Sequence, residues 1–233
     1  MTHPTVYELL VALPVLLFSM VAHEYAHGYA ALKQGDPTAK ELGRLTLNPL
    51  KHIDPFMTVL LPLAVFFGSG GRIVFGGAKP VPVNPRNYRD PRRGDLIVSS
   101  AGIVTNAVLS LACLVLAIAA GAVAGAIPAT EGILALVQRA FFWGVWLNLL
   151  LAFFNLIPIP PLDGSHLLYH VLPPQWAARY RAVGRYGVFA LMLLILIAPQ
   201  VLYGLLTPAF ALQGVACDLA APYTLRPFPL CAI

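Results

Sequence analysis

The longest uninterrupted feature of this sequence is a run without charge: residues 96–130 contain no Lys, Arg, Asp or Glu. A helix needs about 20 apolar residues to cross a bilayer, so this run can hold one. Further apolar runs of suitable length lie at about 5–32, 140–158 and 186–206. Only 11% of all residues are charged, against about a quarter in a soluble domain. The sequence therefore predicts an all-α, polytopic membrane protein, a helical bundle with about four full transmembrane helices.

The basic residues indicate how these helices are oriented. Of the 15 Lys and Arg residues, 13 fall in three loops, at 33–51, 72–93 and 179–185. The positive-inside rule assigns such loops to the cytoplasm. We therefore expect the four helices to run inward, outward, inward and outward in turn. This topology also explains the net charge of +5 without a nucleic-acid partner.

A fifth apolar stretch, 55–71, is shorter and is interrupted by Pro62 and a glycine cluster. If it crossed the membrane fully, the basic residues after it would face outward, so we expect a re-entrant segment. The prolines of the next segment, 75–85, exclude a helix and favour an extended edge strand or a short β-hairpin-like loop. Such an edge could pair with an extended peptide. A plain cytoplasmic loop is the alternative.

The cysteines have no metal-type spacing. Cys113 lies in an apolar run, whereas Cys217 and Cys231 lie in the C-terminal tail with prolines between them. If the last helix runs outward, this pair faces the extracytoplasmic side, where disulfides form and persist. The sequence then predicts a disulfide between Cys217 and Cys231, with two unrelated thiols as the alternative.

An H-E-x-x-H motif, formed by His23, Glu24 and His27, lies at the end of the first apolar run. In a helix, residues four apart project from the same face, so the two imidazoles can bind one metal ion. Glu24 can then take a proton from a metal-bound water, the arrangement of zinc hydrolases. Such residues are costly to bury in a membrane without a function. The motif therefore indicates a catalytic metal site.

A catalytic zinc takes three protein ligands, so one more is needed from elsewhere. Asp163 is the best candidate, because it follows a proline-rich helix stop at the inner end of the third predicted helix. The same segment could be an ordinary helix end with a solvated Asp-Gly turn. His166 and His170, one helical turn apart, are the competing ligands. They lack a suitably placed glutamate, so we expect them at the interface or behind the ligands.

The H-E-x-x-H motif is followed, more than a hundred residues later, by the pattern N-x-x-P-x-P-x-x-D-G at 155–164. This pairing resembles the site-2 protease family of intramembrane zinc metalloproteases. Further stretches similar to that family lie at 43–49, 52–55, 78–84 and 101–106. The resemblance covers residues 23–164. It implies one Zn²⁺ per chain, held by His23, His27 and Asp163, and a water activated by Glu24.

The resemblance also implies how substrate is held. Asn155 would hold the substrate or the tetrahedral oxyanion, and Asn84 and Asn106 would contact substrate. The partner would be a transmembrane segment of another protein, hydrolysed within the lipid bilayer. The chain would lie in a bacterial or archaeal inner membrane with its active site towards the cytoplasm.

We expect a single integral membrane metalloprotease domain, 1–233, with a catalytic core at about 5–172 and a C-terminal helix and tail at 185–233. The chain has no room for the PDZ or CBS modules of many relatives. Ile103 and Met57 stand where proline and glycine are common in the family. Neither position takes part in the chemistry, so we expect these departures to affect packing only.

Three other functions fit parts of the pattern. A prenyl-protein protease also uses H-E-x-x-H, but the N-x-x-P…D-G segment argues against it. A di-iron desaturase needs more histidine clusters than six histidines provide. A membrane scaffold or transporter could bind zinc structurally, but a closed structural site has no use for a base such as Glu24.

Overall fold

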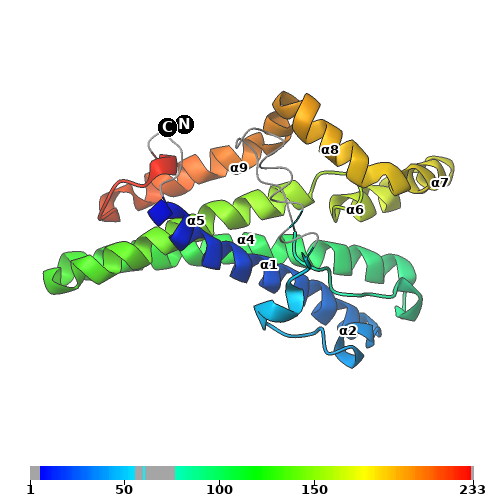
Figure 1. Cartoon of the computed structure of the whole chain (residues 1–233), viewed down its shortest axis with the longest axis horizontal. Helices are drawn as coiled ribbons and strands as arrows, with labels where there is room; N and C mark the ends of the chain where they lie inside the picture. The colour runs from blue at the N-terminus through cyan, green and yellow to red at the C-terminus, as the bar shows by residue number, and fades with distance from the viewer. Residues whose placement is uncertain (1–5, 56–59, 61–76, 232–233) are drawn as a thin grey trace. The chain divides into compact units, whose positions relative to one another are not determined.

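The computed structural model describes residues 6–55, 60 and 77–231. Helices make up most of this part of the chain, and no strand occurs in it. The long helices in Figure 1 are α1 (Val6–Gln34), α4 (Pro91–Ala126), α5 (Glu131–Asn155) and α9 (Pro199–Ala220). The shorter ones are α2 (Thr38–Glu41), α6 (Gly164–Val171), α7 (Pro174–Val183) and α8 (Gly187–Ile197).

Five segments of the described chain are long and apolar enough to cross a membrane. They are Tyr7–Gln34, Pro91–Ala126, Pro128–Asn155, Pro174–Ile197 and Pro199–Tyr223. The prediction of an all-α, multi-pass membrane protein is thus confirmed.

The C-terminal helices differ from the prediction. The single helix expected at 186–206 was wrong, because the backbone leaves the helical conformation at Ala198, with φ −127° and ψ 51°. A proline disfavours the α conformation in the residue before it, and it suits the first position of the next helix. Pro199 therefore ends α8 and opens α9.

The described residues pack into two compact units. The first comprises Met1–Ser19, Asn106–Phe154 and Leu205–Ile233, and the second comprises Met20–Thr105 and Asn155–Gly204. Because α1, α4, α5 and α9 all contribute residues to both, the units are not consecutive segments of the chain.

Contacts in the first unit fix the relative directions of its helices. Along α4 and α5, Gln138 Nε2 donates to Ala117 O (2.9 Å) and Asn106 Nδ2 donates to Asn148 Oδ1 (2.7 Å), so these helices are antiparallel. Asn148 Nδ2 also donates to Ser19 Oγ of α1 (2.9 Å). These bonds satisfy buried amides that would otherwise be costly in an apolar surrounding.

The start of α1 lies beside the start of α5. Glu8 pairs with Arg139 and accepts a hydrogen bond from Trp143 Nε1 (2.7 Å). Since Ser19 contacts α5 further along, α1 and α5 are parallel.

Helix α9 runs opposite to α5. Gln138 Nε2 donates to Tyr223 O just after α9 (2.8 Å), whereas Trp146, further along α5, packs on Phe210 with 5.1 Å between the ring centroids. The relative directions expected for the first three helices are therefore found. If α5 and α9 both cross a membrane, their antiparallel directions mean that the segment joining them makes no net crossing, although Pro174–Ile197 is long enough for one.

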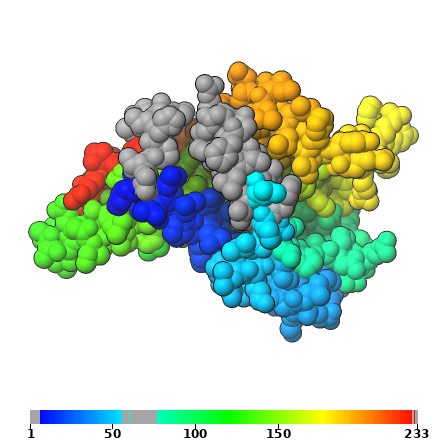
Figure 2. All heavy atoms as spheres, viewed as in Figure 1, coloured from blue at the N-terminus to red at the C-terminus, as the bar shows by residue number. Residues whose placement is uncertain are grey.

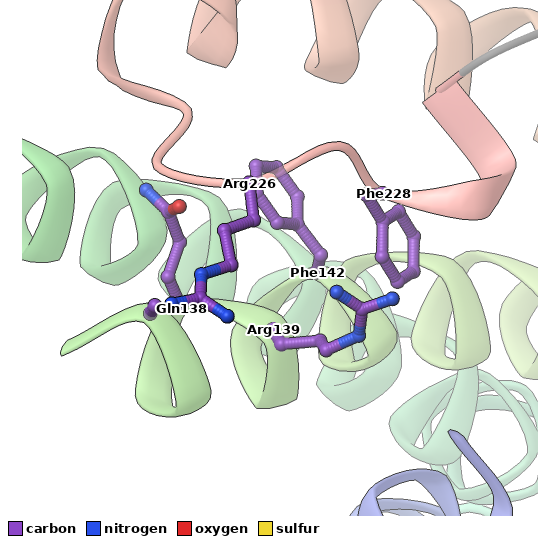
Figure 3. Close-up of a pocket in the computed structure, with 6 residues that line it drawn as sticks. Gln138, Arg139, Phe142, Arg226 and Phe228 are labelled. Atoms are coloured by element: carbon purple, nitrogen blue, oxygen red, sulfur yellow. The ribbon is translucent and has the colours of Figure 1, made fainter. Parts of the chain in front are cut away.

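The C-terminal tail packs onto the start of α5. Cys217 and Cys231 form a disulfide, which confirms that prediction. Phe228 stacks on Phe142 with 5.3 Å between the ring centroids. Figure 3 shows Phe228 and Arg226 projecting from the tail towards α5, which carries Phe142.

In the second unit, a glycine ends α1 soon after the H-E-x-x-H motif. Gly35 has φ +111°, a conformation that favours glycine, and Asp36 N donates to Ala31 O (2.9 Å), as in a Schellman cap. Asp36 is fully buried and accepts hydrogen bonds from Thr38 N (3.1 Å), Asn84 N (2.6 Å) and Asn87 Nδ2 (2.8 Å). This carboxylate therefore fixes the chain after α1 and the irregular segment that ends at Asn84.

The predicted re-entrant segment, 55–71, lies almost entirely outside the described residues. Of the predicted hairpin-like loop, residues 77–84 are described, and they form neither helix nor strand. The hairpin thus remains a prediction. The described part is nevertheless held firmly, because Lys79 N donates to His52 O (2.7 Å) and Arg44 Nη2 donates to Lys79 O (3.0 Å).

Candidate metal centre

Three metal-ligating side chains converge in the second unit. His23 and His27 project from one face of α1, and Asp163 is the N-cap residue of α6. The Nε2 atoms of the two histidines are 3.0 Å apart, and Asp163 Oδ2 lies 3.3 Å from that of His23 and 3.2 Å from that of His27. In the described residues, this is the group whose ligand atoms could hold a metal ion.

The spacing of these three atoms suits a metal ion. Ligands at 2.0–2.1 Å from a tetrahedral zinc lie about 3.3 Å from one another. The carboxylate–imidazole contacts lack hydrogen-bond geometry, so the buried Asp163 Oδ2 has no hydrogen-bond partner among the described residues. A buried carboxylate oxygen without a hydrogen-bond partner is costly on its own. A cation among the three ligand atoms would satisfy it.

Helix α4 shapes the other side of this group. His27 Nδ1 donates to Val98 O (2.7 Å), so that Nε2 of the neutral ring carries the lone pair a metal needs. One helical turn further along, Gly102 leaves open space: a Cβ atom there would lie only 2.5 Å from His27 Nε2 and 2.6 Å from His23 Nε2. Only a glycine fits beside these ligands without moving them.

Glu24 lies between the two histidines in sequence and contacts the irregular segment. Its Oε2 accepts a hydrogen bond from Val81 N (2.7 Å). This bond fixes one oxygen of the carboxylate of Glu24, the residue that follows His23.

Comparisons with known proteins agree with this geometry. A protein of Bacillus subtilis (strain 168) named "Putative zinc metalloprotease YwhC" is 39% identical over 186 residues, which cover 79% of this chain and 78% of that protein. The chain belongs to peptidase family M50, the site-2 protease family. The model of that family, "Peptidase family M50", matches residues 118–197. A Mycobacterium tuberculosis (strain H37Rv) protein named "Putative zinc metalloprotease Rip2" is 31% identical over 212 residues, covering 88% of this chain and 74% of that protein.

No solved structure matches the chain. Membership of family M50 makes this protein a zinc metallopeptidase with membrane-spanning helices, and its cofactor is zinc.

The competing histidines of this M50 protein have another partner. His166 Nδ1 lies 3.2 Å from Asp95 Oδ1, and His170 Nε2 lies 2.7 Å from Asp95 Oδ2. Asp95 belongs to α4, as do Val98 and Gly102, so one face of α4 contacts both α6 and the histidines of α1. The hydrogen bond with Asp95 raises the pKa of His166 above its ordinary value.

Sequence reasoning did not single out Asp95. Its partners in α6 are 71 and 75 residues away along the chain, and no local pattern encodes such contacts. The available signal was its position: it is an acidic residue at the edge of the charge-free run, where an unpaired carboxylate is expensive.

The three asparagines expected to act on substrate lie in different surroundings. Asn155 is the last residue of α5, eight residues before Asp163. Asn84 caps a short 3₁₀ turn, since its Oδ1 accepts a hydrogen bond from Arg86 N (3.2 Å). Asn106 is fully buried in the first unit, where it donates to Asn148. The structure thus gives Asn84 and Asn106 local structural roles, and substrate contact by these residues remains a prediction.

Proposed function

We propose that this M50 peptidase is an endopeptidase that hydrolyses peptide bonds in or near the transmembrane segments of other membrane proteins. The observation that carries the proposal is the convergence of His23, His27 and Asp163 beside Glu24, on elements of an apolar, membrane-spanning fold. We assign the three converging side chains as ligands of one Zn²⁺ and Glu24 as the general base.

Zinc, when bound, lowers the pKa of a water ligand and polarises the scissile carbonyl. The work of the protein is to position the other groups. His27 is oriented through its Nδ1–H bond to Val98 O, and Asp163 is presented at the start of α6. Glu24 accepts the proton of the attacking water and later passes it to the leaving amine. The bond from Val81 N–H holds one oxygen of this carboxylate in place.

We further propose that Asn155 donates a hydrogen bond to the oxygen on which negative charge develops. An amide donor in a site with little water stabilises such charge more than it stabilises the neutral carbonyl. Asn155 ends the same helix whose continuation leads through the proline-rich segment to Asp163. Asn155 therefore lies only eight residues before Asp163 along the chain.

Two independent observations support an orientation with the metal centre towards the cytoplasm of a bacterial cell. The basic loops follow the ends of α1 and α5, where the positive-inside rule expects the cytoplasm. The disulfide joins Cys217, in the last turn of α9, to Cys231 after it. Helix α9 is antiparallel to both α1 and α5, and disulfides persist on the opposite, oxidising side.

The test is Glu24→Gln, measured on purified protein with a model transmembrane substrate. The amide keeps the shape of the side chain but cannot accept a proton, so turnover should fall more than about 10²-fold while zinc content stays stoichiometric. Glu41→Gln, at an exposed position of α2, is the matched control and should keep full activity.

Normal turnover in Glu24→Gln would remove Glu24 from the mechanism. A wild-type protein that holds zinc but cleaves no substrate would favour the alternative of a zinc-binding scaffold or transporter.

A further inference from the structure

A cavity of about 180 Å³ opens beside α6 and α7, within the second unit. The residues that line it include Pro160, Ser165, His166, Tyr169, Tyr180 and Arg181. None of the three proposed zinc ligands lines this cavity, and no carboxylate does. Pockets for drug-sized ligands are about 300–1,000 Å³, so this one suits a smaller group.

The polar groups of the cavity suit an anion. The Arg181 guanidinium lies 3.8 Å from the centre of the Tyr169 ring, and no ion pair to it occurs in the described part of the chain. Stacking on an aromatic face fixes the guanidinium plane and leaves its edge N–H groups free to bind a phosphate in a bidentate manner. Ser165 lines the same cavity, and its hydroxyl can donate a hydrogen bond. Tyr180 also lines it, but its hydroxyl donates to Pro158 O (2.9 Å).

The surroundings of the cavity have the composition of a membrane interface. On and after α7, Arg179 stacks on Trp176 (5.4 Å) and Arg185 stacks on Tyr186 (5.6 Å). Trp176 and Tyr186 are 58% and 60% exposed, and α7 and α8 lie at the surface shown in Figure 2. Exposed Trp and Tyr mark the headgroup level of a bilayer.

The helix directions also support a position of the cavity at the headgroup level of the membrane. The chain between α5 and α9 makes no net crossing, and within it the polar α7 is followed by the wholly apolar α8. A segment that changes from arginine-rich to apolar without crossing belongs at the surface of the membrane, with the cavity at the level of lipid phosphates.

We propose that this cavity binds the phosphate group of an anionic phospholipid, with Arg181 as its main ligand and Ser165 as a second donor. Ser165 belongs to α6, which begins directly after Asp163, so a bound headgroup stabilises the helix that presents this carboxylate. The proposal requires the membrane placement of the chain but not its peptidase activity.

The experiment uses the full chain in a zwitterionic or uncharged detergent and measures thermal unfolding. Three probes are added at equal ionic strength: water-soluble dihexanoyl phosphatidylglycerol, dihexanoyl phosphatidylcholine and inorganic phosphate. We expect phosphatidylglycerol to raise the Tm in a saturable manner and the other two to leave it unchanged. Arg181→Gln should weaken the phosphatidylglycerol effect about 10–100-fold in midpoint concentration, the value of a charge-assisted hydrogen bond.

Arg179→Gln is the matched control, because it removes the same charge from the same helix outside the cavity lining. It should retain the phosphatidylglycerol response. Arg181→Lys keeps the charge without the planar fork and should fall between the wild type and Arg181→Gln. Should Arg181→Gln fail to fold by circular dichroism, Arg181→Lys and Ser165→Ala decide the question, and both should weaken the response.

Several results would overturn the proposal. An equal response to phosphatidylcholine would show that the negative headgroup is not recognised. An equal response to inorganic phosphate would mean that a free anion, not a lipid, is bound. Equal losses in Arg179→Gln and Arg181→Gln would reduce the effect to general surface charge. Because protease activity is not measured, failure of the proposed peptidase function would leave these outcomes unchanged.

Discussion

A buried polar cluster of the first unit differs from the candidate metal centre of the second. In the first unit Asn148 donates to Ser19 and to Gly144 O, and it accepts from Asn106. In the second unit His23, His27 and Asp163 bring three ligand atoms within 4.8 Å, and the buried Asp163 Oδ2 has no hydrogen-bond partner among the described residues. Polar groups that bond to one another in an apolar fold hold helices together, whereas ligand atoms that converge around an unpartnered carboxylate oxygen indicate a metal ion.

The largest expected effect comes from removing one of the three converging ligand atoms. Asp163→Ala should abolish turnover and reduce bound zinc well below one per chain, because two imidazoles alone do not complete a tetrahedral site. His170→Ala is the control, since that imidazole pairs with Asp95 instead. Metal analysis of both purified variants tests the assignment, and zinc retained in Asp163→Ala but lost in His170→Ala would reverse it.

The second effect concerns the first unit, which the disulfide closes. Cys217→Ser should lower the stability by about 3 kcal/mol, the loop-closure value for a loop of about this length. Zinc content should not change, because these cysteines and the proposed ligands lie in different units. Thermal unfolding of Cys217→Ser, and of the wild type with reductant, measures the effect.

Cys113→Ser, at the free cysteine of α4, should leave the reductant response intact. A wild-type Tm that is insensitive to reductant would contradict the stabilising role of the bridge.

The third prediction compares two glycines of α4, Gly102 beside the candidate metal centre and Gly125 far along the helix from it. Gly102→Ala places a methyl group 2.5 Å from His27 Nε2, so a ligand must move. We expect zinc affinity to fall about 10–100-fold, as when a group that orients metal ligands is altered. In Gly125→Ala, on the same helix, the added Cβ meets nothing within 4 Å, and affinity should be unchanged. Competition with a zinc-binding dye distinguishes the two; equal affinities would mean that α4 does not bound the site.

Much of the candidate metal centre could be predicted from the sequence, because its H-E-x-x-H residues lie close together along the chain. His23, Glu24 and His27 fall within one helical turn and a fraction, and the helix geometry alone brings the imidazoles together. Asp163 was identified through its proline-rich segment and the family resemblance. Asp95 and Gly102 were not, since their roles depend on which helices α4 contacts.

The fold could be predicted where the length of an apolar run determines a helix. The helices at 6–34, 91–126 and 131–155 include most of the residues expected from the hydrophobic runs. The break between α8 and α9 was not predicted, because hydropathy depends only on the polarity of side chains. Pro199 instead restricts the backbone conformation of Ala198. The signal, a proline inside an apolar run, was present in the sequence.

The smallest expected effect concerns Asp36, a buried carboxylate of the second unit whose oxygens accept hydrogen bonds. Burial alone would raise the pKa of Asp36, but the hydrogen bonds from Asn84, Thr38 and Asn87 outweigh it and hold this pKa below its ordinary value. A lowered pKa means that the stabilisation is complete above the unfolded value of about 3.9 and is lost as the pH falls through the folded value. Asp36→Asn should cost about 1 kcal/mol at pH 7, because the amide places a donor among donors.

The pH dependence separates this role from a merely steric one. Between about pH 5 and pH 3 the wild-type Tm should fall more steeply than that of Asp36→Asn, whose side chain does not titrate. Asp218→Asn, at an exposed position of α9, should keep the steep wild-type profile. Parallel pH profiles of Tm for the wild type and Asp36→Asn would show that Asp36 contributes shape alone. The irregular segment that ends at Asn84 would then be held by its other contacts, including the bond from Val81 N to Glu24.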